Sequence, residues 1–424
     1  MTAIVDELTW RGLIARSTDE EALRKALATG PVTFYCGFDP TAPSLHVGHL
    51  VQALTLRRLQ QTGHRPLALV GGATGFIGDP RPEAERNLND AETIAEWVTR
   101  LRAQIEPFLS FDEGENGATM VNNLDWTSGL SAIELLRDIG KHFRVNKMLT
   151  KDSVAQRLNS DQGISYTEFS YQLLQAMDFY QLYKRYGCTL QTGGSDQWGN
   201  LTAGLDLLHR LEPEAEVHAL ATPLMTKADG TKFGKSETGT IWLDAEMTSP
   251  YAFYQFWLNT DDRDISGYMR VLSFKSREEL EELEKITEEW PQARTAQRAL
   301  AEELTALVHG EEECAKVIAA SKALFGQGEL VELTEKTLTS AAAELPKAKV
   351  SGLDRPIIEL LVEAGLVASK SAARRTVKEG GAYVNNVRVV AEDAVVTREE
   401  LLHGRWMVLR RGKKNLAAIE VTNA

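Results

Sequence analysis

Residues 31–63, PVTFYCGFDPTAPSLHVGHLVQALTLRRLQQTG, run from a short apolar strand into a longer amphipathic helix. Positions 31–38 are apolar and aromatic, as in a buried strand, and positions 46–63 place apolar residues at helical spacing before a glycine. The same order returns downstream, where predicted strands at 65–75, 118–123 and 187–194 alternate with predicted helices at 91–109 and 197–211. Strands that alternate with helices indicate parallel βαβ units, whose ligands bind at the carboxyl ends of the strands.

The chain changes character twice after this α/β region. Between about 245 and 330 the patterns are helical, as in SREELEELEKITEEW (276–290). Residues 333–350 are rich in Ala, Lys and Thr with little apolar anchorage, which indicates a linker, and a new apolar pattern follows. We therefore expect an α/β domain over 1–228, a loop and helical domain over 229–332, a linker over 333–350 and a C-terminal domain over 351–424.

Composition indicates a large globular protein with more than one domain. The chain has 424 residues, of which 43% are hydrophobic and 25% are charged, and its net charge is −13. We expect neither a membrane span nor a signal peptide, because no long apolar run is present and the N-terminus lacks an apolar core. Cys36, Cys188 and Cys314 are far apart, which favours a reducing cytoplasm over a disulfide framework or a cysteine-rich zinc site.

Two histidines, His46 and His49, stand three apart at the expected start of the 46–63 helix, with Gly48 between them. We expect Ser44 to cap this helix, so that both imidazoles lie on one face of its first turns. Backbone N–H groups and the helix dipole favour an anion such as phosphate there. A zinc pair would need a third ligand, and none follows at ligand spacing. The pattern alone leaves phosphate binding and simple packing open.

A second candidate segment is TKADGTKFGKS (226–236), which places Lys232, Lys235 and Ser236 in a glycine-containing loop directly after the α/β region. Two lysines three apart on a mobile loop can close on a polyphosphate and neutralise charge that develops on a leaving group. Solvated surface loops often have this composition as well, so both interpretations stay open for the loop taken by itself.

Together, HVGH (46–49) and KFGKS (232–236) resemble the signature sequences of class I aminoacyl-tRNA synthetases, in the form found in bacterial tyrosyl-tRNA synthetases. Five motifs occur in the family's order: YCGFDPTAPSLHVGH (35–49), GGATGFIGDP (71–80), SYQLLQAMDFY (170–180), GGSDQWGN (193–200) and KFGKS (232–236). The likeness covers essentially the whole chain, whereas related nucleotidyltransferases with an H-x-G-H would lack most of these motifs. It implies a Rossmann-like parallel-sheet catalytic domain, an α-helical domain that touches the anticodon region, and a small α+β C-terminal domain of the S4 type.

Tyr171, Gln175 and Asp178 form one polar stripe, because they are four and three apart on a helix that is otherwise largely apolar. A buried polar stripe must find partners, which neighbouring backbone could supply. The resemblance implies instead that Asp178, with Tyr35, hydrogen-bonds the phenolic hydroxyl of tyrosine, and that Tyr171, Gln175 and Asp79 hold its ammonium. Such a site rejects phenylalanine by leaving its own polar groups unpaired, an effect for which tyrosyl-tRNA synthetases are the standard example.

The motif QTGGSDQWGN (191–200) ends a predicted strand in two glycines, and Asp196 can cap the next helix without any ligand. The resemblance implies that Gly194 and Asp196 face the ribose of adenosine, and that Gln191 and Gln197 line the tyrosine site. Cys36, on composition alone a small buried residue, would also reach towards the ribose.

The loop GDPRPEAER (78–86) departs from the family, which often continues with Ser-Gly and lysines that help bind pyrophosphate. This loop is one residue shorter and contains Arg81 and Arg86 but no lysine. Arg86 is expected to bind ATP. Whether Arg81 replaces the missing lysine stays open, and Pro82 makes the loop stiffer.

The last 74 residues hold 12 Lys and Arg against 9 Asp and Glu, in contrast to the acidic remainder of the chain. Their pattern predicts a helix, a glycine stop, a second helix capped by Ser369, and a hairpin turn at Asn385–Asn386. Lys370, Arg374, Arg375 and Lys378 share one face of the second helix. Such stripes are usually only solvated, but this segment resembles S4-type modules, in which that helix faces RNA phosphates.

The reaction implied by the resemblance has two steps. The carboxylate of tyrosine attacks the α-phosphorus of ATP and releases pyrophosphate, and the terminal ribose hydroxyl of tRNA(Tyr) then takes the tyrosyl group. Mg²⁺ arrives with ATP, since no carboxylate cage is visible. No side chain acts as nucleophile, so catalysis rests on positioning and electrostatics from Thr41, His46, His49, Lys232 and Lys235. The further ATP contacts implied by the resemblance are Cys36, Gly37, Asp39, Gly48, Arg86, Gly194, Asp196 and Ser236.

The family is homodimeric, and the region around Tyr166 would lie near the interface. Two alternatives stay open. One is an RNA-binding scaffold derived from a synthetase, for instance an intron splicing cofactor. The other is a tryptophanyl-type synthetase, against which Tyr35 and Asp178 argue because an indole has no hydroxyl group.

Overall fold

The computed structural model describes residues 4–80, 88–161, 163–229, 233–236, 239–352 and 355–422. The chain forms two compact units, one of residues 1–244 and 261–291 and the other of residues 245–260 and 292–424. Residues 261–291, which we expected in the helical domain, thus pack with the first unit. The buried Arg11 contributes to this packing, because it donates hydrogen bonds to the carbonyl oxygens of Arg270, Ser273 and Lys275 at 2.8–2.9 Å. The expected domain bounds themselves stay a prediction.

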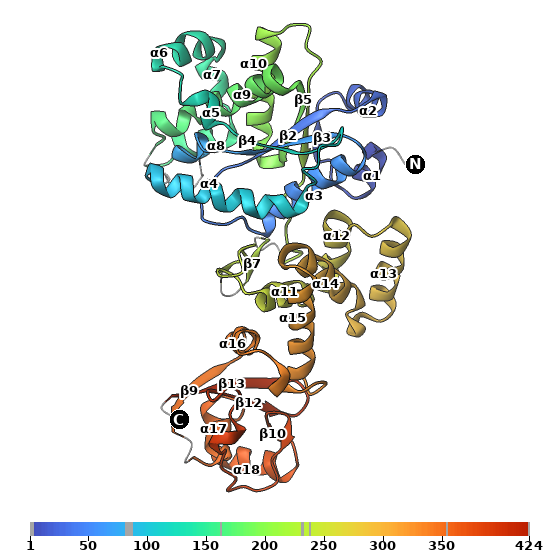
Figure 1. Ribbon diagram of the computed structural model, residues 1–424, viewed down its shortest axis with the longest axis vertical. Helices are drawn as coiled ribbons and strands as arrows, with labels where there is room; N and C mark the ends of the chain where they lie inside the picture. Colours follow the sequence, from blue (N-terminus) through green and yellow to red (C-terminus); the bar gives the residue numbers. More distant parts are fainter. Residues whose placement is uncertain are drawn as a thin grey trace. The chain divides into compact units, whose positions relative to one another are not determined.

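A six-stranded sheet in the order β1-β6-β5-β2-β3-β4 forms the centre of the first unit (Figure 1). Its strands are β1 (Arg16–Ser17), β2 (Thr33–Phe38), β3 (Arg65–Val70), β4 (Thr119–Asn122), β5 (Cys188–Gly194) and β6 (His218–Thr222). All neighbours are parallel except β1, which runs antiparallel to β6. The predicted parallel α/β fold is therefore confirmed. Strands β1 and β6 were not predicted: β1 has two residues, and β6 is buried along its whole length and so shows no alternation.

The strand order reverses between β2 and β5. From β2 the chain moves outward through β3 to β4, and it then returns to the other side of β2 to form β5 and β6. Parallel sheets open a crevice at such a reversal, outside the carboxyl ends of the strands. The residues that follow β2 and those that end β5 therefore meet at one edge of the sheet.

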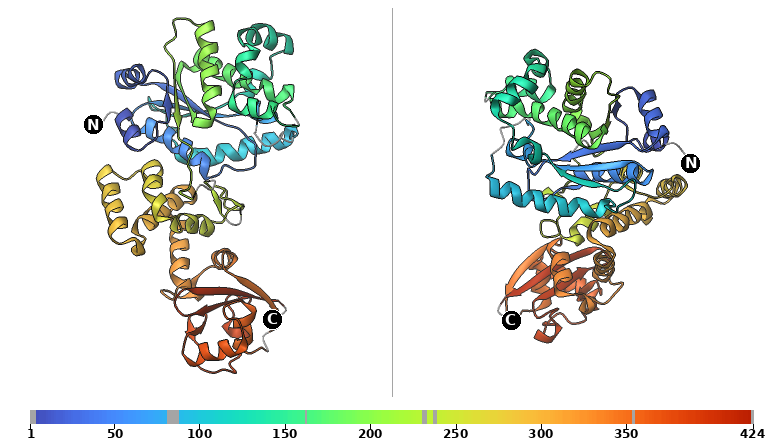
Figure 2. Two further views of the ribbon diagram at one scale, coloured as in Figure 1. Left: turned by 180° about the vertical axis from the view of Figure 1, so that it is seen from behind. Right: turned by 45° about the horizontal axis from the view of Figure 1, so that its top comes forward.

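Helices cover both faces of this sheet, with α3 (Val47–Gln61) and α4 (Ala91–Ile105) on one face and α9 (Tyr166–Tyr186) and α10 (Trp198–Leu211) on the other (Figures 1 and 2). Apolar side chains of α9 and α10, such as Met177, Phe179 and Leu208, pack with Leu67 and Leu69 of β3 in one core. These four helices match the predicted ones. Helix α9 begins after Ser165, which accepts from the Glu168 N–H, and ends at Gly187 with a φ of 64°.

The remaining α-helices of the first unit are α1 (Ile4–Trp10), α2 (Glu20–Thr29), α5 (Leu124–Thr127), α6 (Ala132–Glu134), α7 (Val145–Met148), α8 (Asp152–Leu158), α12 (Asp262–Leu272) and α13 (Arg277–Glu289). Two short strands, β7 (Lys235–Ser236) and β8 (Gly239–Thr240), pair with each other. None of the helices in the described residues is long and apolar enough to span a membrane.

The second unit begins with the helices α11 (Pro250–Leu258), α14 (Thr295–His309), α15 (Glu311–Leu324) and α16 (Glu335–Ala343). Its five-stranded sheet has the order β11-β10-β12-β13-β9, in which only β9 and β13 are parallel. The strands are β9 (Lys347–Ser351), β10 (Ala382–Val384), β11 (Val387–Arg388), β12 (Trp406–Arg411) and β13 (Asn415–Thr422), and α17 (Ile357–Glu363) and α18 (Lys370–Lys378) complete this part.

The interpretation of 333–350 as a linker is wrong as a statement about local structure. This stretch contains α16 and most of β9, and β9 is an edge strand of the sheet. Leu338, Ala341 and Ala342 of α16 are buried. Small alanine side chains suffice for this close packing, which is why the segment looked weakly anchored. By contrast, the predicted Ser369 cap and the Asn385–Asn386 turn are confirmed, the turn with φ values of 47° and 67°.

Candidate active site

A cavity of about 1160 Å³ lies at the crevice between β2 and β5. Its walls come from the carboxyl ends of these strands, the start of α3 and the inner side of α9. Most of the site residues expected from the sequence line it, namely Tyr35, Cys36, Gly37, Asp39, His46, Gly48, His49, Asp79, Tyr171, Gln175, Asp178, Gly194, Asp196 and Gln197. Its volume is large enough for an amino acid together with a nucleotide.

Other expected site residues lie elsewhere. Gln191 does not line the cavity; it is fully buried behind Tyr35, whose hydroxyl donates to its Oε1 at 3.2 Å. Its place in a parallel strand turns its side chain towards Gly204 of α10. Thr41 also lies outside the lining, in a turn where its N–H donates to the Asp39 carbonyl oxygen.

Part of the expected phosphate site lies outside the described residues. Arg86 and Lys232 belong to this part, as does Arg81. Lys235 and Ser236 are described by their backbone in β7.

The two histidines of HVGH cap α3 themselves. The helix begins at Val47 with His46 as its N-cap, so the expected Ser44 cap is wrong. Residues 45–47 are extended instead and pair with 241–243, with Leu243 N–H donating to the Leu45 carbonyl oxygen. His46 Nδ1 accepts from Gly48 N–H at 3.0 Å, and His49 Nδ1 accepts from His46 N–H at 3.2 Å. The two rings stack with their centroids 4.0 Å apart.

This capping arrangement determines which ring nitrogen of each histidine can donate a hydrogen bond to a ligand. Because each Nδ1 accepts a backbone hydrogen bond, each ring carries its proton on Nε2. Burial, followed by the neighbouring His46, lowers the pKa of His49 to about 3, so His49 is neutral at physiological pH. The pair therefore presents neutral N–H donors, together with a helix N-terminus, to the cavity.

Gly48 makes the stacked arrangement possible. A Cβ atom at Gly48 would lie 2.7 Å from Cε1 of His46. The imidazole of His46 therefore lies directly against this glycine.

Asp178 is held from two sides at the inner end of the cavity. Its Oδ1 accepts from Nε1 of Trp126 at 2.8 Å, and its Oδ2 accepts from Nδ2 of Asn123 at 2.9 Å. Burial raises the pKa of Asp178 to about 7; the two hydrogen bonds lower it, and the Asp39 charge raises it again. Burial also raises the pKa of Tyr35, so that its hydroxyl stays protonated. This end of the cavity can bind a hydroxyl group.

A chain of hydrogen bonds connects Asp178 with Asp39. Asn123 Nδ2 also donates to the Thr74 hydroxyl at 3.0 Å, and that hydroxyl donates to Asp39 Oδ1 at 2.6 Å. Tyr171 donates to the other Asp39 oxygen at 2.7 Å. Asp39, expected at the ATP, thus lies in the network that also holds Tyr171.

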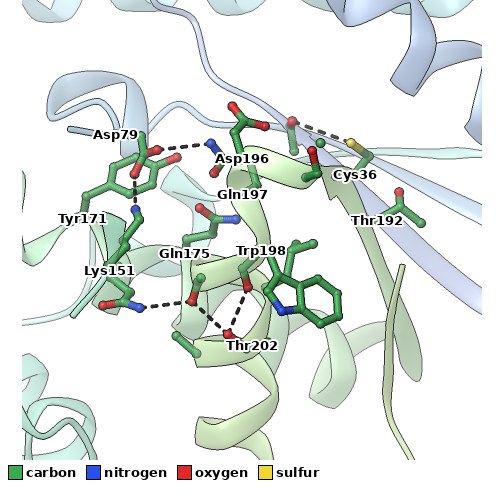
Figure 3. Close-up of a pocket in the computed structure, with 18 of the residues that line it drawn as sticks. Cys36, Asp79, Lys151, Tyr171, Gln175, Thr192, Asp196, Gln197, Trp198 and Thr202 are labelled. Carbon is green, nitrogen blue, oxygen red and sulfur yellow. Dashed lines mark hydrogen bonds and ion pairs between the residues drawn. The ribbon is translucent and has the colours of Figure 1, made fainter. Parts of the chain in front are cut away.

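Acceptor groups gather on the Asp79 side of the cavity, as Figure 3 shows. Asp79 Oδ2 accepts from Nε2 of Gln197 at 3.1 Å, and its Oδ1 accepts from Nζ of Lys151 at 2.8 Å. Oε1 of Gln175 is buried, and no hydrogen-bond partner for it exists among the described residues. Because an unpaired buried acceptor is costly, the position favours a donor such as an ammonium group.

Cys36, Gly194 and Asp196 form another part of the lining, on the side of β2 and β5. Burial raises the pKa of Cys36 to about 12, so its thiol is neutral. Gly194 leaves room for the Asp196 carboxylate, since a Cβ at Gly194 would lie 2.5 Å from Oδ1. The alternative in which Asp196 caps α10 is wrong, because that helix begins after Gln197.

The base of the KFGKS loop is attached to two elements. On one side, the Ile241 N–H donates to the Gly234 carbonyl oxygen, and a Cβ at Gly234 would lie 2.8 Å from Val47. On the other side, the Tyr268 hydroxyl of α12 donates to the Thr226 carbonyl oxygen at 3.1 Å, and its ring meets Phe233 edge to face. The loop is thereby tied to the start of α3 and to α12.

In the second unit, Lys370, Arg374, Arg375 and Lys378 are all exposed on α18, opposite the buried Ala373 and Val377. Lys370 pairs with Glu359 at 2.7 Å and Arg374 with Glu392 at 3.7 Å, so two of the four charges are partly neutralised.

Sequence reasoning missed Asn123, Trp126, Thr74, Lys151 and Asn200. Each acts on an expected site residue from a distant segment. Thr74 and Asn200 lie in the motifs 71–80 and 193–200 but were given no role, and the other three belong to no motif. Asn123 ends the predicted strand 118–123, and a polar residue at a strand's carboxyl end is the one local signal that could have identified it.

Comparison with known proteins agrees with this geometry. Residues 27–326 match the family described as tRNA synthetases class I (W and Y), and residues 337–419 match the tyrosine–tRNA ligase SYY-like C-terminal domain. The chain is 79% identical to a tyrosine–tRNA ligase of Streptomyces coelicolor over 100% of both chains, and 61% identical to that of Thermobifida fusca over 99% of both.

A solved structure supports the same relationship. It is a C-terminally truncated mitochondrial tyrosyl-tRNA synthetase of Aspergillus nidulans, which is 30% identical, covers 77% of this chain and 95% of its own, and has a TM-score of 0.69. The family includes the synthetases for tryptophan (W) and for tyrosine (Y). The two curated relatives are both tyrosine–tRNA ligases, which decides in favour of tyrosine. The chain therefore belongs to the tyrosine–tRNA ligases, which are class I aminoacyl-tRNA synthetases.

Proposed function

We propose that this tyrosine–tRNA ligase forms tyrosyl-adenylate in the cavity between β2 and β5. The observation that carries the proposal is that this one cavity is lined by the imidazole pair at the start of α3, by Asp178 and by the Asp79 acceptors. A phosphate, a phenol and an ammonium can each be bound there. Attack of the tyrosine carboxylate on the α-phosphorus then forms the new P–O bond and releases pyrophosphate.

The amino acid would lie with its phenol at Asp178 and Tyr35 and its ammonium at Asp79, Tyr171 and Gln175. Oε1 of Gln175 supports the ammonium position because it is buried and lacks a partner among the described residues. Tyr171 donates to Asp39, so a lone pair of its oxygen can accept from the ammonium. Gln191 would act indirectly, by holding the Tyr35 hydroxyl.

ATP would lie with its ribose near Cys36, Gly194 and Asp196 and its phosphates at the start of α3. The Nε2–H groups of His46 and His49 would donate to phosphate oxygens as negative charge develops. Lys232 and Lys235 would approach from the KFGKS loop. Thr41, Gly37, Asp39, Gly48, Arg86 and Ser236 stay predictions for ATP binding. Mg²⁺ would enter as part of the ATP substrate; no group of three His, Cys, Asp or Glu side chains in the described ranges could hold a metal ion.

The α18 stripe would bind tRNA phosphates, so that the second unit serves the transfer step and not adenylate formation. A cytoplasmic location fits this role, and the three cysteines are buried thiols without disulfides.

The first unit would form a homodimer through an apolar surface. Ile133, Val145, Leu136 and Tyr166 are large side chains that are 50–69% exposed, on α6, α7 and neighbouring segments and at the start of α9. Large apolar side chains exposed to this degree are typical of a protein interface. In sedimentation experiments we expect a dimer for the wild type and a monomer for Ile133→Glu. Val387→Glu, at an equally exposed apolar residue of β11, should remain dimeric; a dimeric Ile133→Glu variant would place the interface elsewhere.

ATP–pyrophosphate exchange with each of the common amino acids tests the proposed activity. We expect exchange with tyrosine alone and loss of selectivity against phenylalanine in Asp178→Ala. Exchange driven by tryptophan, or unchanged selectivity in Asp178→Ala, would contradict the assignment. Transfer to tRNA is then measured separately with the same preparations.

A further inference from the structure

We propose that the ε-ammonium of Lys151 and the α-ammonium of tyrosine compete for the same acceptors, so that Lys151 sets the selectivity for ligands that carry an ammonium. This inference rests on the proposed function of the cavity. It concerns a residue of the segment before α8 that belongs to none of the sequence motifs.

Lys151 makes two hydrogen bonds at the ammonium subsite, of which Figure 3 shows the ion pair with Asp79. Its Nζ donates to Oδ1 of Asp79 and to Oδ1 of Asn200, both at 2.8 Å. Asn200 in turn donates to the same Asp79 oxygen at 3.1 Å and to Oε1 of Gln197 at 2.8 Å. A carboxylate oxygen and an amide oxygen are acceptors of the kind that a primary ammonium group binds.

The pair is built into the wall of the cavity. The Lys151 side chain is 8% exposed and that of Asp79 is 18% exposed. Ion pairs that contribute little to stability are exposed to solvent, and this pair is not. The aliphatic part of Lys151 lies on Gly199, where an added Cβ would be only 3.3 Å from Cγ. A glycine in the first turn of α10 thus leaves the space that this lysine uses.

The ammonium groups of Lys151 and of a bound tyrosine cannot both form full hydrogen bonds with the acceptors of this subsite. Oδ1 of Asp79 is already bound by Lys151 and Asn200, and Oδ2 is bound by Gln197. A second cation at this carboxylate would also be repelled by the first. Tyrosine must therefore displace Lys151 from Asp79, whereas a ligand without an α-ammonium leaves the ion pair intact. Lys151 is a positioning residue, since it acts through Asp79.

Replacement of Lys151 by methionine tests the competition, because methionine keeps an aliphatic stem on Gly199 and removes the cation. In the full-length protein we expect the Kd for L-tyrosine to fall by about 3-fold to 10-fold. Without the lysine, Asp79 is available to the ligand in a larger fraction of the molecules. The Kd for 3-(4-hydroxyphenyl)propanoate, which is tyrosine without its amino group, should stay constant or rise. Both constants are measured by calorimetry, the weaker one by competition with tyrosine.

Lys147→Met is the matched control. Lys147 lies in α7, four residues before Lys151, and pairs with Asp206, and both of these side chains are well exposed. Neither Kd should change by more than about 2-fold, because a solvated pair contributes little.

The ratio of the two constants separates the alternatives. If Lys151→Met raises the Kd for tyrosine alone, Lys151 helps to bind tyrosine, and the proposed competition is wrong. If both ligands weaken together, Lys151 only supports the fold, which also overturns the inference. If the wild type binds no tyrosine at all, the proposed function fails instead. A crystal structure of the wild type with tyrosine provides an independent measurement: Lys151 should lie beyond ion-pair distance of Asp79, and an intact pair beside the bound ligand would refute the proposal.

Discussion

At Asp178, burial and hydrogen bonding act on the carboxyl group in opposite directions. Burial is the stronger influence and raises the pKa of Asp178 from an ordinary 3.8 to about 7, although Asn123 and Trp126 stabilise the charged form. Between these two pH values the folded protein binds more protons at this site than the unfolded chain. The contribution of Asp178 to stability therefore falls as pH rises through this window, and it is constant above about pH 7.

We expect this dependence to disappear in Asp178→Asn. Between about pH 5 and about pH 7, the free energy of unfolding of the wild type should fall relative to that of the variant, by at most about 1.4 kcal/mol per pH unit. Urea unfolding of both proteins measures the difference. Asp125→Asn, at an exposed carboxyl of α5, is the control and should differ from the wild type by a constant amount. A constant difference for Asp178→Asn as well would mean that its carboxyl is not perturbed.

Gly48→Ala should disturb the imidazole pair. The added Cβ would lie 2.7 Å from the His46 ring, so the ring must leave its cap and its stacking contact with His49. We expect the kcat of ATP–pyrophosphate exchange to fall by about 10-fold to 100-fold, the effect of misplacing donors to developing charge. The KM for tyrosine should change by less than about 2-fold, because its binding groups are elsewhere.

Gly267→Ala is the corresponding control, since a Cβ at Gly267 of α12 meets no atom within 4 Å. This variant should retain exchange activity and gain slightly in helix stability. Equal losses in both variants would mean that the imidazole pair has no special role in the phosphate step.

The motifs, through the family resemblance that they carry, were sufficient to predict most of the cavity lining, but not the residues that support it. Trp126 lies 52 positions from Asp178 and Lys151 lies 72 positions from Asp79. No helical or strand period connects such pairs, because the fold alone brings them together. Ser44 was the wrong cap for a similar reason: pairing of 45–47 with 241–243 keeps the chain extended up to His46.

At the scale of elements, α12 supports the KFGKS loop. The Tyr268 hydroxyl holds the Thr226 carbonyl oxygen, and the Ala228 N–H donates to Oδ1 of Asp264 at 2.8 Å. Local patterns had predicted a helical region after residue 245 and the strands β2, β3, β4 and β5 of the central sheet. They could not predict this support, because packing of 261–291 with the first unit depends on Arg11 and other distant groups.

Tyr268→Phe removes one hydroxyl group and keeps the edge-to-face ring contact with Phe233. We expect the KM for ATP to rise and the kcat of exchange to fall, each by about 3-fold to 10-fold, as for the loss of one hydrogen bond. The Kd for tyrosine should remain unchanged, because α12 contributes nothing to the cavity lining. Tyr186→Phe, at a 42% exposed residue, should have no effect on either value. A change confined to tyrosine binding would contradict the role of α12.

At the scale of the whole molecule, the second unit was predicted well in outline but not at its beginning. Gly365, Ser369 and the Asn385–Asn386 pair carry local signals, and the structure has the corresponding helix end, cap and turn. Residues 335–351 carry few such signals. Their strand β9 is defined by pairing with β13, which lies about 70 residues further along the chain.

Replacement of the four basic residues of α18 by glutamine tests the division of labour between the units. All four are exposed, so the fold should persist, and ATP–pyrophosphate exchange should be unchanged. The KM for tRNA(Tyr) should rise by about 10-fold or more. Each lost phosphate contact lowers the slope of log affinity against log salt by about 0.7 to 0.9.

The ion pairs of Lys370 and Arg374 limit the change in the salt dependence of tRNA binding. Because Glu359 and Glu392 already neutralise part of their charge, we expect the salt slope to fall by about 2 rather than by the full value for four contacts. A control replaces four basic residues of the first unit, Lys25, Arg100, Arg102 and Lys285, and should leave the slope unchanged. An equal loss in both proteins would show that tRNA responds to total charge. Loss of exchange in the α18 variant would show that the second unit also serves adenylate formation.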